Sequence, residues 1–595
     1  YNTMMDLVPG AVDRPVKTTR YLGSYSLDIK LPVDGLKFRS NLGLDARTVQ
    51  DYEFWSAKTS NRGMGTSYAK NAVDKYTMFT LENMLFYDKT FNDKHTLGVT
   101  LLQSIQEDKR ESVNVAMENL PADNLKYYDL GSGLVTNTIG SSMIKWNMAS
   151  FMGRINYNYL GRYLLTVSAR YDGSSRLADG HKWVLFPSAA LAWRINEESF
   201  MSSTSGWLDN LKLRLGFGKT GNSAVDPYQT KGTLSLIRYP FDNGGTPTIG
   251  YAPNAMANSL LTWETTDQWN LGIDFGVLRG RINGTIDLYM QNTHDLLLKR
   301  QLPVVSGFPD VLSNVGKTRN KGIEVSINSM NINSKDFQWT TDLMLSSNKE
   351  EIVELYNGKN DDIGSKWFIG QPVNVHYDYR KVGIWQNTES DLAEMAKFAA
   401  NGTEFAPGDI KIQDVNGDYK ITDADKQILG NPRPKLIASM VNTFNYKGFD
   451  LSVFLYASFG AMLYNDIYAV EHCGRNGGVK VDYWTPNNPT NAYPRPSIDE
   501  ERPIYITSTY YEKADFLRVK TMTLGYTLPK TLTNKFLVEK LRVYFTAQNP
   551  FIFTNYTGID PEAAKVNSAG NPETNGSGFG TPSVSSWIFG INLTL

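Results

Sequence analysis

Apolar and polar residues alternate along most of this 595-residue chain. Every second residue is apolar from Trp269 to Val277, and after the short segment 278–280 the pattern restarts at Ile282 and runs to Met290. Such alternation is typical of a β-strand with one apolar and one polar face, and two runs joined by a short turn predict a β-hairpin. The last residues, 587–595, repeat the pattern.

About seventeen such runs follow one another, and no long stretch shows sustained helical periodicity. They start near residues 24, 36, 75, 95, 143, 163, 183, 211, 260, 281, 316, 337, 435, 449, 513, 541 and 585, after a polar opening segment, 1–23. Many are longer than the strands of most soluble sheets. The sequence therefore predicts an all-β fold.

The connections between these runs alternate between short and long. Short turns fall at 33–35, 91–94, 159–162, 278–280, 331–336 and 446–448. Long polar loops fall near 51–74, 107–142, 219–257, 292–315, 350–433 and 465–512. Outer-membrane barrels have short periplasmic turns and long extracellular loops. This pattern favours a transmembrane antiparallel β-barrel, with an apolar face toward outer-membrane lipid, over a soluble β-protein.

Composition narrows the choice of function. Lys and Arg number 60 against 61 Asp and Glu, a balance that argues against a nucleic-acid partner. No stretch of about 18 consecutive apolar residues occurs, which excludes transmembrane helices. The single cysteine, Cys473, excludes a disulfide framework. We find no nucleophile–base constellation, so we do not expect an enzyme; a barrel-borne hydrolase is the alternative.

The sharpest local motif runs from Asp414 to Asp425. Oxygen-bearing side chains fall at motif positions 1, 3, 5, 9 and 12, and position 7 can offer a backbone carbonyl; these residues are Asp414, Asn416, Asp418, Thr422, Asp425 and Lys420. Ca²⁺ prefers oxygen ligands at this spacing. The motif predicts a structural Ca²⁺ or Mg²⁺ ion. Tyr419 stands where the sharp turn prefers glycine, and an Asx-rich turn without an ion is the alternative.

Three aromatic residues, Tyr483, Trp484 and Tyr493, cluster in the loop 465–512. Exposed aromatic rings can stack on sugar rings, whereas most loop aromatics are packing anchors. We take the three residues as candidates for substrate binding, with packing as the alternative.

Several segments resemble one known family when they are taken in chain order. They are Arg162–Arg176, Leu185–Glu198, Leu211–Asn222, Gly408–Pro434, Tyr483–Asn487, Asp515–Pro529 and Tyr556–Glu562. Together they resemble the barrel of SusC/RagA-type TonB-dependent outer-membrane transporters of Bacteroidetes, over about residues 20 to 595. No plug sequence and no TonB box is recognisable in the chain.

The resemblance implies active import of a nutrient oligomer across the outer membrane, usually a glycan fragment (an oligosaccharide) and in one branch a peptide. It implies a SusD-like surface lipoprotein that acts as a lid, and energy supplied by TonB through an N-terminal plug. It also allows two transporter–lipoprotein pairs to assemble as a dimer. We expect the loops near 219–257, 350–433 and 465–512 to form the lid-binding surface. An oligopeptide importer of the same family and a non-transporting surface glycan-binding β-protein are the alternatives.

Strand counting leads to a further expectation. Transporters of this class close at about 22 strands, and about seventeen are recognised here. We therefore expect residues 1–595 to be the C-terminal part of such a barrel. The plug and the first strands would lie on a separate N-terminal segment, which pairs with this chain along an edge strand.

Overall fold

The computed structural model describes residues 3–241, 248–465, 480–497, 502–536, 538–562 and 583–594. Cys473 and the terminal Leu595 lie outside these residues, as do parts of the predicted loops 219–257 and 465–512. The chain divides into two compact units. Unit 1 comprises Tyr1–Trp193, Gly216–Gln268 and Thr293–Val315, and unit 2 comprises Arg194–Leu215, Trp269–Asn292 and Gly316–Leu595.

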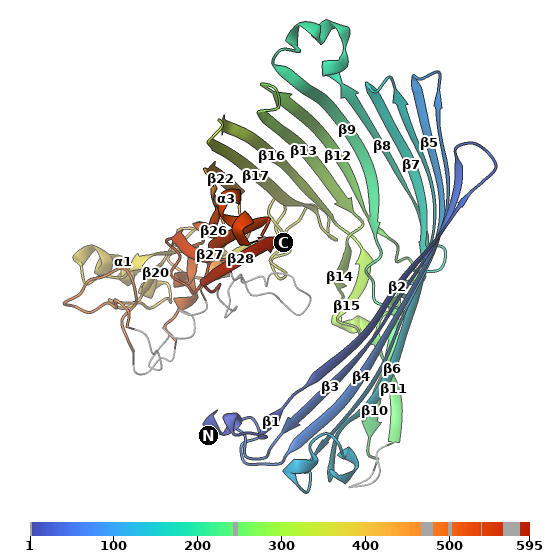
Figure 1. Ribbon diagram of the computed structural model, residues 1–595. Coiled ribbons are helices and arrows are strands. Elements are labelled where there is room, and N and C mark those ends of the chain that lie inside the picture. The colour runs from blue at the N-terminus through green and yellow to red at the C-terminus, as the bar shows by residue number, and fades with distance from the viewer. Residues whose placement is uncertain are drawn as a thin grey trace. The chain divides into compact units, whose positions relative to one another are not determined.

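The described residues form an antiparallel sheet of eighteen strands, so the predicted all-β fold is confirmed. In unit 1 the sheet strands are β1 (Val12–Asp13), β2 (Val16–Lys30), β3 (Leu36–Trp55), β4 (Tyr68–Phe91), β5 (His95–Glu118), β6 (Val135–Tyr159), β7 (Tyr163–Ser174) and β8 (Trp183–Arg194). Each of β2 to β7 pairs with the next strand in sequence, and these strands lie side by side in Figure 1. Two separate hairpins, β10–β11 (Thr233–Tyr239, Thr248–Ala255) and β14–β15 (Leu297–Gln301, Asp310–Asn314), complete the strands of this unit.

Unit 2 holds another run of paired neighbours. Its sheet strands are β16 (Lys317–Asn333), β17 (Phe337–Glu354), β22 (Leu436–Tyr446), β23 (Phe449–Phe459), β26 (Phe516–Thr527), β27 (Lys540–Thr554) and β28 (Ser586–Thr594). Each pairs antiparallel with the next. Strand β8 lies in unit 1 apart from its last residue, Arg194. The residues of three further strands are shared more evenly between the units: β9 (Leu208–Asn222), β12 (Glu264–Val277) and β13 (Ile282–His294). The last two confirm the hairpin predicted from the alternation.

The remaining elements are short. Small strands are β18 (His376–Tyr379), β19 (Lys381–Ile384), β20 (Ile410–Ile412), β21 (Lys426–Gly430), β24 (Met462–Tyr464) and β25 (Tyr511–Lys513). The α-helices are α1 (Glu389–Ala400) and α3 (Lys530–Thr533). The 3₁₀ turns are Thr3–Leu7, Asp123–Leu125, Leu130–Ser132, Ile195–Glu197, Ser199–Thr204, Gln229–Lys231, Val304–Ser306, Asp423–Asp425, Ile506–Thr509 and Asn534–Phe536. No helix among the described residues is long and apolar enough to cross a membrane.

The strands of unit 1 carry different chemistry on their two faces. Residues directly opposite each other on paired strands share a face. One such row joins Leu42, Leu81 and Ile105, whereas the other face carries ion pairs such as Arg20–Asp45, with 2.6 Å between Nη2 and Oδ2. The first face suits lipid and the second suits a wet interior.

Two expectations about the strands were wrong in detail. The first long strand, β2, begins at Val16, not near residue 24, and β3 to β6 extend far into the predicted loops 51–74 and 107–142. Beyond the lipid both faces of a strand meet water, so the backbone ladder continues without an apolar stripe to reveal it. The predicted loop 350–433 also contains α1, a helix that the sequence pattern does not predict.

Candidate functional site

A small folded subdomain occupies most of the predicted loop 350–433. Strand β18 pairs with β21 and β19 pairs with β20, while α1 lies between β19 and β20 in the chain. Two clusters of buried apolar side chains pack these elements together, one around Trp385 and the other around Trp484. The first contains Trp385, Met395 and Phe398, and Trp385 is fully buried. This loop therefore has its own apolar core, as expected of a long functional loop.

Helix α1 is held by a capping hydrogen bond at its N-terminus and by ion pairs on one of its faces. The Thr388 side chain accepts a hydrogen bond from the backbone N–H of Asp391 (3.3 Å), which satisfies one of the free donors at the helix start. Lys411 Nζ lies 3.2 Å from Asp391 Oδ1 and 2.5 Å from Glu394 Oε2, and it sits 4.0 Å from the centre of the Trp385 ring system. One lysine thus joins the helix to the buried tryptophan.

The predicted cation loop forms a tight turn beside α1. Asp414 accepts the backbone N–H groups of Gly417 and Tyr419, each at 2.8 Å. Asp425 is fully buried and accepts the N–H groups of Val415 (2.9 Å) and Thr422 (2.8 Å). The carboxylate oxygens of Asp414 and Asp425 thus accept hydrogen bonds from backbone N–H groups of the turn. Among the described residues, no group of three or more His, Cys, Asp or Glu is placed to hold a metal.

The other motif residues act inside the same turn. Asn416 Nδ2 donates to Asp418 Oδ2 (3.0 Å), and Asp418 Oδ1 accepts the N–H of Lys420 (2.8 Å). Tyr419 has a φ of 56°, the left-handed conformation for which glycine is usual. Its ring packs edge-on against Phe398 of α1, with 5.5 Å between ring centres, which offsets that strain. The ion itself stays a prediction.

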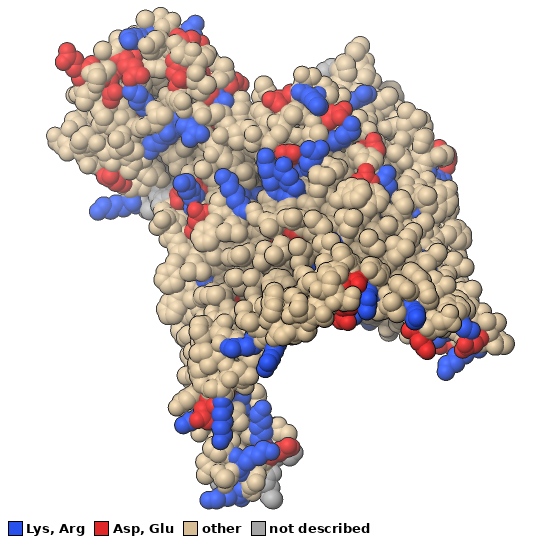
Figure 2. Space-filling model, turned by 90° about the horizontal axis from the view of Figure 1, so that it is seen from above, with Lys and Arg blue, Asp and Glu red and all other residues tan. Residues whose placement is uncertain are grey.

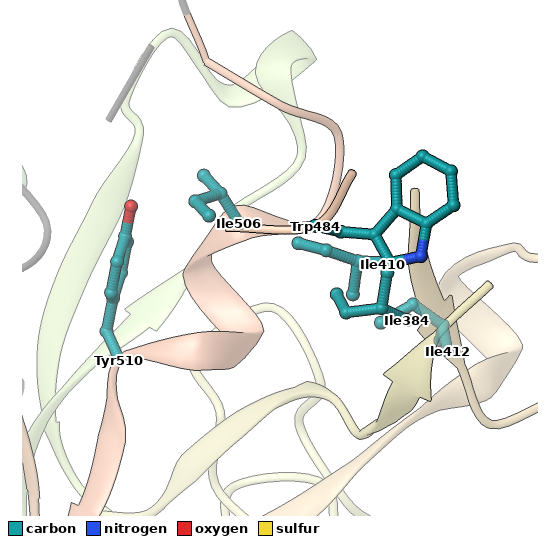
Figure 3. Close-up of a cluster of buried hydrophobic side chains, with 6 residues drawn as sticks. All are labelled: Ile384, Ile410, Ile412, Trp484, Ile506 and Tyr510. Atoms are coloured by element: carbon teal, nitrogen blue, oxygen red, sulfur yellow. The ribbon is translucent and has the colours of Figure 1, made fainter. Parts of the chain in front are cut away.

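The three aromatic candidates come together through backbone contacts. Tyr483 and Tyr493 form a β-bridge, and Trp484 N–H donates to the carbonyl of Tyr493 (3.0 Å). Trp484 is only 6% exposed and belongs to one buried cluster, drawn in Figure 3, with Ile384, Ile410, Ile412, Ile506 and Tyr510. Its indole N–H donates to Gln386 Oε1 (2.8 Å). This burial favours the packing interpretation for Trp484, whereas Tyr483 is 46% exposed and stays a candidate for substrate contact.

Three titratable groups of the subdomain are perturbed by burial. Burial lowers the pKa of His376, whose ring Nε2 lies 2.8 Å from the carbonyl oxygen of Met462. Burial lowers the pKa of Lys381 to about 8, and its Nζ donates to the carbonyl of Ala492 (2.6 Å). Burial, followed by the charge of Asp423, raises the pKa of Tyr379 to about 12. His376 and Lys381 each contact a backbone carbonyl of another segment, and these contacts link β18 and β19 to those segments.

A buried ion cluster anchors the residues that follow β27. Arg518 on β26 and Asp560 have side chains only 5% and 4% exposed, and Arg518 Nη2 lies 2.5 Å from Asp560 Oδ1. Glu562 Oε2 lies 3.0 Å from Arg518 Nε, and its carboxylate also pairs with Lys520. Asp560 also accepts the N–H groups of Glu562 (2.9 Å) and Ser583 (3.0 Å). Sequence reasoning missed this cluster, although it falls in the segment 515–529 and the segment 556–562 that carried the resemblance.

Charged side chains are interspersed by sign. Figure 2 shows Lys and Arg beside Asp and Glu on the face in view, without a patch given over to one sign. Exposed ion pairs occur among the described residues, such as Lys317 with Glu354 at 2.7 Å. Such pairs add little stability each, but they keep the surface electrically balanced.

Comparison with known proteins identifies the family. The family described as TonB dependent receptor-like, beta-barrel, matches residues 8–549. The chain belongs to this family. Its place is therefore the outer membrane, in a family of receptors rather than of enzymes, and the SusC/RagA-type resemblance is confirmed.

Curated relatives are similar over most of the chain. TonB-dependent receptor P3 of Formosa agariphila is 32% identical over 581 residues, which cover 94% of this chain and 56% of the relative. TonB-dependent receptor SusC of Bacteroides thetaiotaomicron is 35% identical over 434 residues, 70% of this chain and 41% of SusC. The chain thus spans about half the length of the curated relatives it matches.

The fold is similar to solved structures of the RagAB peptide transporter. One of them superposes with a TM-score of 0.81 at 22% identity, covering 98% of this chain and 62% of that chain. At this identity the similarity shows the fold alone.

Proposed function

We propose that this receptor imports a nutrient oligomer, a glycan fragment, across the outer membrane with energy supplied through TonB. The observation that carries the proposal is the 35% identity to SusC, together with membership of the TonB-dependent receptor family. The choice of a glycan rests on the resemblance to SusC/RagA-type transporters. A peptide is the second candidate, because the RagAB structure with the same fold is described as a peptide transporter.

The geometry of unit 1 suits a passage for a polar substrate. The face opposite the apolar rows carries ion pairs on neighbouring strands, including Arg39–Asp28 (2.7 Å) and Lys70–Asp51 (2.5 Å). Glycans and peptides are both rich in hydrogen-bonding groups that such a wall can solvate. Tyr483 adds an exposed ring in the folded loop region of unit 2, where it can stack on a sugar.

The proposal includes two protein partners. A SusD-like lipoprotein would act as the lid, and the folded subdomain 376–430 offers it a rigid surface. A segment carrying the plug and further strands would pair with β2. Within unit 1, β2 pairs with β3, and its side chains are almost all exposed, with Tyr21 and Leu22 each 73% exposed. A strand edge left open in lipid costs several kcal/mol per unpaired group, which supports such pairing.

Binding to the purified receptor–lipoprotein complex tests the substrate class. Labelled oligosaccharides and labelled oligopeptides of similar length would be titrated into the same complex. Saturable binding of an oligosaccharide, weakened by Tyr483→Ala, is expected. Saturable binding of peptides without any oligosaccharide bound would replace the glycan with the second candidate.

A further inference from the structure

The apolar face of unit 1 carries a groove of about 540 Å³ over β4 to β7. Leu101, Phe151 and Tyr171 form much of its wall, and each side chain is about half exposed. Gly153 and Ala169 lie directly opposite each other on β6 and β7, so the floor lacks bulky side chains. We call this feature the lipid-face groove. Its volume falls within the range of sites that hold small molecules.

One wall of the lipid-face groove is held in place by stacking. Trp183 of β8 stacks on Phe151 and on Tyr171, with 6.3 and 4.9 Å between ring centres. A wall stacked in this way is already formed before anything binds. The groove therefore does not depend on a side-chain rearrangement.

A row of hydrogen-bonded polar side chains borders the groove. Ser40 Oγ donates to Asn83 Oδ1 (2.8 Å), and Asn83 Nδ2 donates to Gln103 Oε1 (2.8 Å). The three residues lie directly opposite one another on β3, β4 and β5. They share the face of Leu42, Leu81 and Ile105, so the polar row is set into the apolar surface.

Gln103 is the last residue of this polar row, and its side-chain amide N–H group at the groove has no acceptor among the described residues. Gln103 Oε1 accepts the hydrogen bond from Asn83, and Gln103 Nε2 donates to no acceptor within the described part of the chain. In a membrane no water is at hand to take up an amide N–H, so the missing acceptor is costly. A molecule bound in the groove should therefore offer an oxygen atom that accepts a hydrogen bond from Gln103 Nε2.

The charged residues of the same face set the depth of Gln103. Glu107 lies directly opposite Phe79 and is the next residue of this face beyond Ile105 on β5, so it marks the outward end of the apolar band. Gln103 is four residues further in. With a rise of about 3.3 Å per residue and a strand tilt of about 45°, this places Gln103 ~9 Å below Glu107. The outer leaflet supplies acyl chains at this depth, together with the ester and hydroxyl oxygens near their heads.

We propose that the lipid-face groove binds one acyl chain of lipopolysaccharide, the acylated glycolipid of the outer leaflet. Gln103 Nε2 donates a hydrogen bond to an ester carbonyl or hydroxyl oxygen of that chain. The chain lies over Gly153 and Ala169, against the stacked wall. This site is separate from the import path, because it lies on the opposite face of the sheet.

Two variants remove different parts of the site. Gln103→Leu keeps the volume of the side chain but removes the donor. Gly153→Leu fills the floor, and the space permits it, because a Cβ at Gly153 would meet Leu101 Cδ2 at 3.7 Å, an ordinary contact. Leu191→Phe is the control, since Leu191 is exposed on the same face and does not line the groove. Ala169→Leu replaces Gly153→Leu if that variant fails the heat-modifiability test for a folded barrel.

The experiment measures lipid bound to the full-length receptor. The receptor is purified from outer membranes in mild detergent, delipidated, and incubated with rough lipopolysaccharide or with phosphatidylethanolamine before native mass spectrometry. The wild type and Leu191→Phe should retain lipopolysaccharide, and Gln103→Leu and Gly153→Leu should retain about tenfold less at a fixed concentration. Equal retention by all variants, or equal binding of phosphatidylethanolamine, would overturn the proposal. So would a change from dimer to monomer in Gly153→Leu without a change in lipid, because the groove would then hold a second copy.

Discussion

Replacing Asp560 by alanine should loosen the segment after β27 more than any exposed ion-pair variant does. Arg518 and Asp560 are each about 95% buried, so the variant leaves a guanidinium with little access to water. Removing one partner of a buried pair costs about 3–5 kcal/mol. Glu562, 3.0 Å from Arg518 Nε, still balances part of the buried positive charge of Arg518. We therefore expect a loss at the lower end of that range, ~3 kcal/mol.

The loss can be measured locally and globally. Hydrogen exchange of the full receptor in detergent should show protection falling in residues 556–562 and 583–594, because Asp560 accepts the N–H groups of Glu562 and Ser583. The midpoint of denaturant unfolding should fall as well. Asp336→Ala is the matched control, because its partner Lys447 is 3.9 Å away and both side chains are 58% exposed. That pair is worth less than about 1 kcal/mol. Equal effects of Asp560→Ala and Asp336→Ala would refute the reasoning.

Protonation of Asp560 at low pH should likewise lower the stability of the folded state. Burial alone would raise the pKa of Asp560, but the N–H groups of Glu562 and Ser583 and the charge of Arg518 outweigh it and lower the pKa below 3.8. A carboxyl with a lowered pKa in the folded state stabilises that state above its unfolded value. This stabilisation is lost as the pH falls from 3.8 through the lowered value.

Three further predictions concern the folded subdomain of unit 2. Burial lowers the pKa of His376 below 6.5, so the folded state holds the ring neutral, and protonation below pH 6.5 should loosen the packing around it. The Met462 N–H, which donates to the carbonyl of Asn431 (2.8 Å) beside this ring, should then lose protection from hydrogen exchange, and His376→Gln should abolish that pH dependence. Trp484→Ala should destabilise the subdomain by about 3–5 kcal/mol in thermal unfolding, whereas Tyr483→Ala should change stability by less than about 0.5 kcal/mol and act on glycan binding alone. If Ca²⁺ binds the loop 414–425, EDTA should speed its proteolysis and added Ca²⁺ should reverse the effect; identical cleavage with and without Ca²⁺ would leave the turn held by its backbone hydrogen bonds alone.

The sequence could reveal the strands where lipid imposes a pattern. The alternation from Trp269 to Met290 predicts β12 and β13 to within a few residues, because one face must be apolar for the whole width of the membrane. Outside the lipid that constraint ends. On β5, residues 106–112 are polar on both faces, so the sequence pattern predicts a loop where the outer half of that strand lies. Helix α1 was missed because only Met395 and Phe398 are buried on it, although Thr388 before Asp391 was an available start signal.

The candidate site shows the same limit. The spacing of oxygens identified the turn 414–425, but spacing cannot tell whether a carboxylate faces an ion or the backbone. Asp425 accepts the N–H groups of Val415 and Thr422, a use that depends on how the turn folds. Likewise, the sequence placed Trp484 in a long loop, and only the packing of Ile384 and Ile410 around it shows that it is a core residue.

Uptake by living cells tests the central claim most directly. Cells that carry or lack the receptor gene would receive a fluorescent oligosaccharide bound by the purified complex, with and without a protonophore that dissipates the energy used by TonB. The account predicts accumulation inside the outer membrane only when the receptor and the energy source are both present. Equal accumulation without the receptor, or accumulation that is insensitive to the protonophore, would contradict active import by this protein.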